Sequence, residues 1–129
     1  MLLGFKKRFA PSVEDGSKTH TIRARRKRAP RVGEICHCYT GLRQKGARLL
    51  GRFECVRVQE IRIRVYRNRI MIAIDGIWLS EDEVELFARS DGFQPVGETL
   101  SARSVMARYW SLEGIHAFTG DLIHWEYRR

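Results

Sequence analysis

Apolar and polar residues alternate over several stretches of the chain, a pattern that is typical of half-buried strands. A long run over residues 47–63 and a shorter one over residues 69–74 predict two of these strands, and the pair Asp75-Gly76 predicts a turn after the second. Similar patterns predict strands at Leu2 to Phe5 and at residues 19–23, 34–40 and 122–127. We therefore expect a sheet of about five to seven strands.

Helical periodicity interrupts this pattern in three places. A brief helix is expected at residues 10–14, before the turn Asp15-Gly16. Ser80 and Glu83 have the spacing of a capping box, which predicts a helix that ends at Asp91-Gly92. A further helix is expected over residues 100–110. The combination predicts an α+β protein, or a small, partly open β-barrel with two or three short helices, and Trp110 and Trp125 are assigned to its core.

Length and composition favour one globular domain over residues 1–129. Apolar residues make up 43% and charged residues 30% of the chain, and no apolar run approaches the ~18 to 20 residues of a membrane span. The N-terminal charges Lys6, Lys7 and Arg8 follow a very short apolar run, which is the reverse of a secretory signal, so a cytoplasmic location is expected. No membrane partner is expected.

Positive charge narrows the class of partner. Lys and Arg number 24 against 15 Asp and Glu, and Arg outnumbers Lys. Guanidinium groups bind phosphate in a bidentate way and stack on bases, so the excess favours RNA over the alternative of a soluble domain that happens to be basic.

Residues 23–31 hold six basic residues and no acid. The residues expected to contact substrate or RNA are Arg23, Thr19, Arg25, Arg26, Arg28, Tyr39 and Arg43. Five arginines form a second basic strip: Arg57, Arg62, Arg64, Arg67 and Arg69. Tyr39 and Trp78 could stack bases, although packing is an equally open role for each.

The segment Gly16-Ser17-Lys18-Thr19-His20-Thr21-Ile22-Arg23 carries the densest candidate chemistry. A turn glycine precedes a strand on which Thr19, Thr21 and Arg23 alternate to one face, while His20 faces away. The cluster could bind phosphate, or a deprotonated Lys18 could activate Thr21 as a nucleophile. An exposed polar edge strand is the alternative without chemistry.

This segment also resembles the ASCH domain, a branch of the PUA-like superfamily. The resemblance rests on Phe5, Arg8, Phe9, Gly16, Lys18-Thr19, Thr21-Ile22-Arg23, Val32-Gly33-Glu34 and Tyr39, and it continues through Ala88-Arg89-Ser90-Asp91-Gly92-Phe93, Tyr109-Trp110 and the terminal strand. It covers nearly the whole chain and implies a PUA-like barrel. The Lys-Thr-x-Thr-Ile-Arg core is more specific for that fold than for a reaction.

The resemblance implies RNA binding and two possible enzymatic activities. Members of the family are implicated in RNA binding, one small bacterial group hydrolyses N4-acetylcytidine with a Lys, a Thr and a Glu, and another member is described as a ribonuclease. Lys18 and Thr21 match the first two residues of that group, and the acid falls on Asp91, where the group has glutamate. The implied catalytic set is therefore Lys18, Thr21 and Asp91. A non-catalytic module that recognises an RNA base or a modified nucleotide is the alternative.

No cofactor or metal is expected. Cys36-His37-Cys38 places adjacent side chains on opposite faces of a strand, and no second ligand pair completes a tetrahedral site. With Cys55 the cysteines number three, which favours reduced thiols over disulfides. His116 and His124 have no evident partner in the sequence. The oligomeric state stays open between a monomer and a weak dimer.

Overall fold

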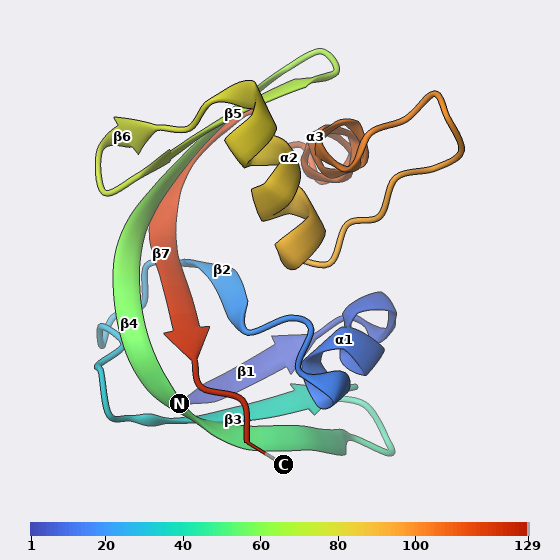
Figure 1. The fold of residues 1–129 in the computed structure, drawn as a ribbon. Coiled ribbons are helices and arrows are strands. Elements are labelled where there is room, and N and C mark those ends of the chain that lie inside the picture. The colour runs from blue at the N-terminus through green and yellow to red at the C-terminus, as the bar shows by residue number, and fades with distance from the viewer. Residues whose placement is uncertain (129) are drawn as a thin grey trace. The chain divides into compact units, whose positions relative to one another are not determined.

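The computed structural model describes residues 1–128 (Figure 1). Its elements are, in chain order, β1 (Leu2–Phe5), the 3-10 helix η1 (Lys7–Phe9), α1 (Ala10–Asp15), β2 (His20–Ala24), β3 (Ile35–Thr40), β4 (Arg48–Tyr66), β5 (Arg69–Ile74), β6 (Ile77–Trp78), α2 (Glu81–Ser90), α3 (Ala102–Leu112) and β7 (Ala117–Trp125). The predicted α+β class is confirmed.

The strands form one mixed sheet of seven members. Its main path runs β1-β3-β4-β5-β6, and β7 pairs with both β2 and β4. β1 and β3 are parallel, whereas the β3–β4, β4–β5 and β5–β6 pairs are antiparallel. Within residues 1–128 this pairing does not close into a barrel, so the sheet is open.

Several elements differ from the predicted boundaries. β4 continues to Tyr66, and β7 begins at Ala117, before the apolar run that predicted it. β6 was not predicted because two residues are too short to produce a period. α3 begins at Ala102 because the Ser101 hydroxyl caps it by accepting a hydrogen bond from the N–H of Ser104.

The described chain forms two compact units, each built from separated pieces of sequence. Unit 1 contains Met1–Thr21, Arg26–Val58 and the chain from Ile123 onward, and unit 2 contains Ile22–Arg25 and Gln59–Leu122. The expectation of one domain stays a prediction.

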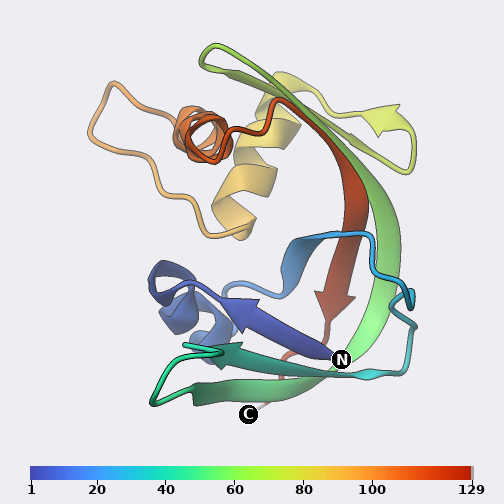
Figure 2. The same cartoon turned by 180° about the vertical axis from the view of Figure 1, so that it is seen from behind.

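Aromatic packing organises the core of unit 1. The ring of Trp125 lies edge-on to Phe5, with 5.9 Å between centroids, and stacks on Phe53 at 6.1 Å. Tyr127 also packs on Phe53, with 5.6 Å between the ring centroids. The helix α1 lies beside β1 (Figure 2). The assignment of Trp125 to the core is confirmed.

In unit 2, α2 and α3 pack against β5 (Figure 1). The strand face beneath the helices is apolar, with Ile63 and Ile72 fully buried. Phe93 packs on Tyr109 at 5.3 Å, and Trp110 packs on Phe118 at 5.1 Å, which confirms Trp110 as a core residue.

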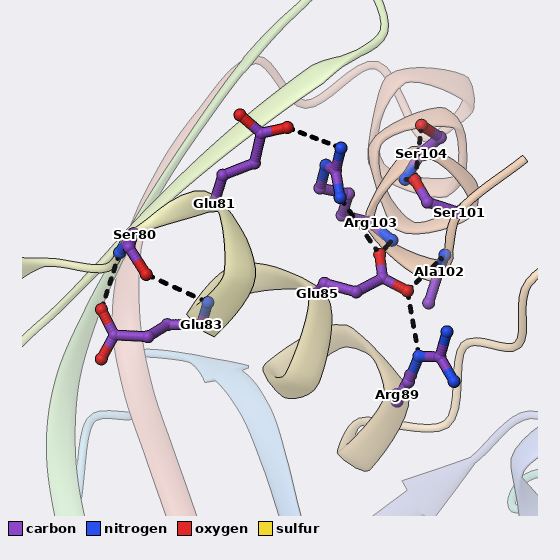
Figure 3. A network of polar contacts seen from close by, with 9 residues as sticks. All are labelled: Ser80, Glu81, Glu83, Glu85, Arg89, Ser101, Ala102, Arg103 and Ser104. Atoms are coloured by element: carbon purple, nitrogen blue, oxygen red, sulfur yellow. Dashed lines mark hydrogen bonds and ion pairs between the residues drawn. The ribbon is translucent and has the colours of Figure 1, made fainter.

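Polar contacts fix the start of both helices in unit 2 (Figure 3). The Ser80 hydroxyl accepts from the N–H of Glu83, and the Glu83 carboxylate accepts from the N–H of Ser80, so the predicted capping box is confirmed. Arg103 of α3 forms an ion pair of 2.6 Å with Glu81 of α2.

Candidate functional site

The approach to the candidate site is a tight turn after α1. Gly16 ends the helix with φ 84°, a left-handed conformation that favours glycine. The Asp15 carboxylate accepts from the Ser17 hydroxyl at 2.6 Å and from the Ser17 N–H at 2.8 Å, and these bonds hold the pKa of Asp15 below its usual value. The Lys18 N–H then donates to the Ser12 carbonyl at 2.9 Å. These contacts fix the backbone that presents Lys18 and leads into β2.

Lys18 and Thr21 are both buried in unit 1, at 4% and 5% exposure. The Lys18 Nζ lies 5.4 Å from the centroid of the Phe9 ring. An exposed edge strand was the alternative. Within the described residues β2 pairs with β7 alone and is therefore an edge strand, but Lys18 and Thr21 are buried rather than exposed. The structure therefore places an amine and a hydroxyl inside unit 1, on one short segment of chain.

His20 is also buried, at 6% exposure, and its ring lies 5.7 Å from that of His124. The two strands meet here, since the Trp125 N–H donates to the Thr19 carbonyl at 2.9 Å. Sequence reasoning missed this histidine pair because the partners are far apart in the chain and neither carries a motif.

Asp91 lies in unit 2, directly after α2. Its backbone N–H donates to the Phe87 carbonyl at 2.9 Å, and Gly92 follows with φ 105°, so the helix ends here as predicted. The side chain is buried, with the whole residue 6% exposed. Lys18 and Thr21 thus share one unit, and Asp91 belongs to the other.

The residues expected to contact RNA have varied environments. Arg25 forms an ion pair of 2.7 Å with Glu60, and Arg26 donates to the Leu2 carbonyl at 2.8 Å. Arg28 is exposed, as is Arg43, whose φ of 66° lies in the turn before β4. Three further members of this set are half-buried: Thr19, Arg23 and Tyr39. Their roles in binding stay predictions.

A cavity of about 730 Å³ in unit 1 was not predicted. It lies where the parallel strands β1 and β3 both end, and the Thr40 hydroxyl donates to the Phe5 carbonyl across this end at 3.0 Å. Its lining contains four cationic residues and no acidic residue: Lys6, Lys7, Lys45 and Arg48. Arg48 is held by Glu14 at 2.6 Å. These cations are dispersed in the sequence, so no single run indicated them.

The cysteines are buried, free thiols. Burial raises the pKa of Cys36 to about 12, and the neighbouring Cys55 contributes to the rise. Burial also raises the pKa of Cys55. Among residues 1–128, no group of three or more His, Cys, Asp or Glu side chains is arranged to hold a metal ion.

No helix within residues 1–128 is both long enough and apolar enough to cross a membrane. No protein-family model, curated protein or solved structure matches the chain.

Proposed function

We propose that this chain is an ASCH-family, PUA-like protein that hydrolyses an N4-acetylcytidine-type nucleoside or cleaves RNA. One observation carries the proposal. Within residues 1–128 the buried polar or charged residues are Lys18, His20, Thr21 and Asp91. Three of these four are the residues that the family resemblance nominates for catalysis.

Burial of such residues needs a reason, because Lys and Asp are seldom buried in proteins without a specific role or partner. Lys18 is the one buried cationic residue in the described chain, and Asp91 is the one buried acid. Titratable groups in desolvated positions are frequent in catalytic sites. Their coincidence with the residues of the resemblance supports a site rather than a solvated face.

The proposed reaction is an amide hydrolysis through a covalent intermediate. The Thr21 hydroxyl oxygen attacks the acetyl carbonyl carbon while the Lys18 amine takes the hydroxyl proton. The C–N bond then breaks while Asp91, acting in its protonated form, donates a proton to the leaving amine nitrogen. Water next attacks the acetyl carbon of the Thr21 ester, the C–O bond to Thr21 breaks, acetate leaves, and the Lys18 ammonium returns its proton to the Thr21 oxygen. Arg23 holds a carbonyl or a base edge rather than transferring a proton, because guanidinium does not deprotonate in proteins.

The test is to incubate the purified protein with N4-acetylcytidine and to follow cytidine release by chromatography. Thr21→Ala and Lys18→Ala are expected to reduce release by about 10²-fold or more while the far-UV spectrum is retained. Thr119→Ala, which changes an exposed hydroxyl, is the matched control and should keep full release. A wild-type protein that releases no cytidine would refute amidohydrolysis of the free nucleoside.

Asp91 is tested separately because it departs from the glutamate of the amidohydrolase group. Asp91→Asn should abolish release, whereas Asp91→Glu should retain it, since it restores the longer acid of the family. Asp82→Asn, on the exposed first turn of α2, is the control. Full release by Asp91→Asn would remove Asp91 from the mechanism.

A non-catalytic RNA-binding module is the second candidate. The cavity lined by Lys6, Lys7, Lys45 and Arg48 favours it, because a lining with several cations and no acid suits phosphate groups, although Arg48 is already paired with Glu14. Under this alternative, RNA binds with a strong salt dependence and no product forms. Lys7→Gln with Lys45→Gln should then weaken binding, whereas Arg52→Gln with Arg128→Gln, which removes two exposed cations outside the cavity, serves as the charge-matched control.

A further inference from the structure

The exposed aromatic side chains of unit 2 gather at one cavity. Within residues 1–128 the exposed aromatic residues are Tyr66, at 70% exposure, and Trp78, at 49%. Both line a cavity of about 510 Å³, a volume within the usual range for small-molecule sites. Met71, also exposed, lines the same cavity. Water contact of large apolar side chains is unfavourable, so their convergence indicates a surface that is covered by a ligand.

Strand register explains how these side chains come to share a face. Tyr66 of β4 pairs with Arg69 of β5, and Arg64 pairs with Met71 two residues along. Residues that are directly opposite, or two apart, project to the same side of a sheet. Trp78 is aligned with Ala73, which is two residues beyond Met71, and so lies on this side as well. The adjacent strands β4, β5 and β6 therefore present aromatic and cationic groups together.

The cavity also carries a net positive charge. Three arginines line it, namely Arg64, Arg69 and Arg103, against one acid, Glu81. Glu81 is already paired with Arg103. Within the described residues Arg64 and Arg69 form no ion pair, so two guanidinium groups beside the aromatic rings remain uncompensated. The Arg67 guanidinium lies 5.4 Å from the centre of the Tyr66 ring, within cation–π range.

We propose that this cavity binds a single-stranded oligonucleotide, with bases stacked on Trp78 and Tyr66 and phosphates on Arg64 and Arg69. Stacking needs an exposed ring, and phosphate binding needs an uncompensated cation within one nucleotide's reach. A purely apolar partner would leave the arginines unsatisfied, and an acidic peptide would leave the rings without a stacking partner. The chemistry is common to RNA and DNA single strands. The site lies in unit 2, apart from Lys18 and Thr21, and shares with the proposed function only the class of partner.

Tryptophan fluorescence gives a direct test, because Trp110 and Trp125 are buried and Trp78 is the exposed tryptophan. Titration of a fluorescein-labelled oligouridylate of twelve nucleotides is followed at low salt by anisotropy, and an unlabelled copy is followed by quenching of tryptophan emission. Binding should quench the wild type. Trp78→Phe should keep binding but lose the quenching, since phenylalanine still stacks. Oligodeoxythymidylate in a parallel titration measures whether RNA is preferred.

Variants separate stacking from charge. Tyr66→Ala with Trp78→Ala should weaken binding by about ten-fold or more. Ile77→Ala, exposed beside Trp78 but outside the cavity, should bind as the wild type does. Arg64→Gln with Arg69→Gln should make binding less sensitive to salt: the magnitude of the negative slope of log association constant against log salt concentration should fall by about 1.4. Arg52→Gln with Arg128→Gln is the matched control, because it removes two exposed cations that do not line the cavity.

Three outcomes would overturn the proposal. These are no binding by the wild type at low salt, unchanged binding by the aromatic double variant, or a dimer in sedimentation that the same variant disrupts. The last would identify the surface as a contact between copies of this chain. Cytidine release is measured on the same variants and should be unchanged, so failure of this proposal and failure of the hydrolase proposal give different results.

Discussion

Glu85 of α2 accepts a hydrogen bond of 2.9 Å from the backbone N–H of Arg103 in the first turn of α3. Its other carboxylate oxygen accepts from the N–H of Ala102 at 3.1 Å and from the Arg89 side chain at 3.0 Å. The first N–H groups of a helix have no partner within the helix, so a carboxylate from a neighbouring helix can accept their hydrogen bonds. Its negative charge is also attracted to the positive, N-terminal end of the helix dipole. Glu85 thereby links the two helices of unit 2 (Figure 3).

This contact predicts a pH dependence of stability. Burial pushes the pKa of Glu85 upward, but the hydrogen bonds from Arg103, Arg89 and Ala102 and the charge of Arg89 outweigh it, so the pKa lies below its usual value of 4.5. A carboxyl with a lowered pKa in the folded state adds stability above its unfolded pKa, and this stability is lost as the pH falls through the folded value. Glu85→Gln should therefore reduce the difference between urea midpoints at pH 7 and pH 3. Glu98→Gln, in an exposed loop, should leave that difference as in the wild type.

The capping box of α2 predicts a measurable loss on mutation. Ser80→Ala removes the acceptor for the N–H of Glu83, and such caps contribute about 1 kcal/mol to the free energy of unfolding. Ser80→Asp keeps an acceptor and should restore most of that stability. Urea denaturation followed by circular dichroism distinguishes the two, and equal losses in both variants would mean that the hydroxyl does not act as a cap.

Gly16 and Gly33 form a matched pair for backbone and packing effects. Both have φ between 80° and 95°, so alanine at either costs roughly 1 to 2 kcal/mol of backbone energy. A Cβ at Gly16 would also lie 2.6 Å from the Tyr127 ring, whereas a Cβ at Gly33 meets nothing within 4 Å. Gly16→Ala should destabilise the protein more than Gly33→Ala does in thermal unfolding. When both substitutions are made in the Tyr127→Ala background, and each is compared with Tyr127→Ala alone, Gly16→Ala should destabilise the protein by nearly the same amount as Gly33→Ala.

The thiols provide a chemical prediction. Because thiolates are the reactive form, burial and the raised pKa values of Cys36 and Cys55 should make the native thiols resistant to iodoacetamide at pH 8. In guanidinium all three cysteines should be alkylated, as counted by mass spectrometry. Rapid modification of the native protein at Cys36 would contradict the structure.

The sequence anticipated those features that leave a local signal. Alternation predicted β5 with its observed bounds, and the serine–glutamate spacing predicted the start of α2. β6 and the first part of β7 left no such signal, because Ile77-Trp78 is too short and Thr119-Gly120-Asp121 is polar. The burial of Lys18, Thr21 and Asp91 could be expected only through a family resemblance, since each would otherwise suit a solvated surface. The cavities depend on strand register and on residues that are distant in sequence, which composition and periodicity do not encode.

The interleaving of the two units has a consequence for synthesis on the ribosome. Residues of unit 1 emerge first, but Trp125, which packs on Phe5 and Phe53, is translated only after the whole of Gln59–Leu122. At ~5–20 residues per second this delay lasts several seconds, during which the apolar faces of β1 and β4 lack their last strand. The core of unit 1 is therefore completed only after the residues of unit 2 have been synthesised, when the ring of Trp125 becomes available to Phe5 and Phe53.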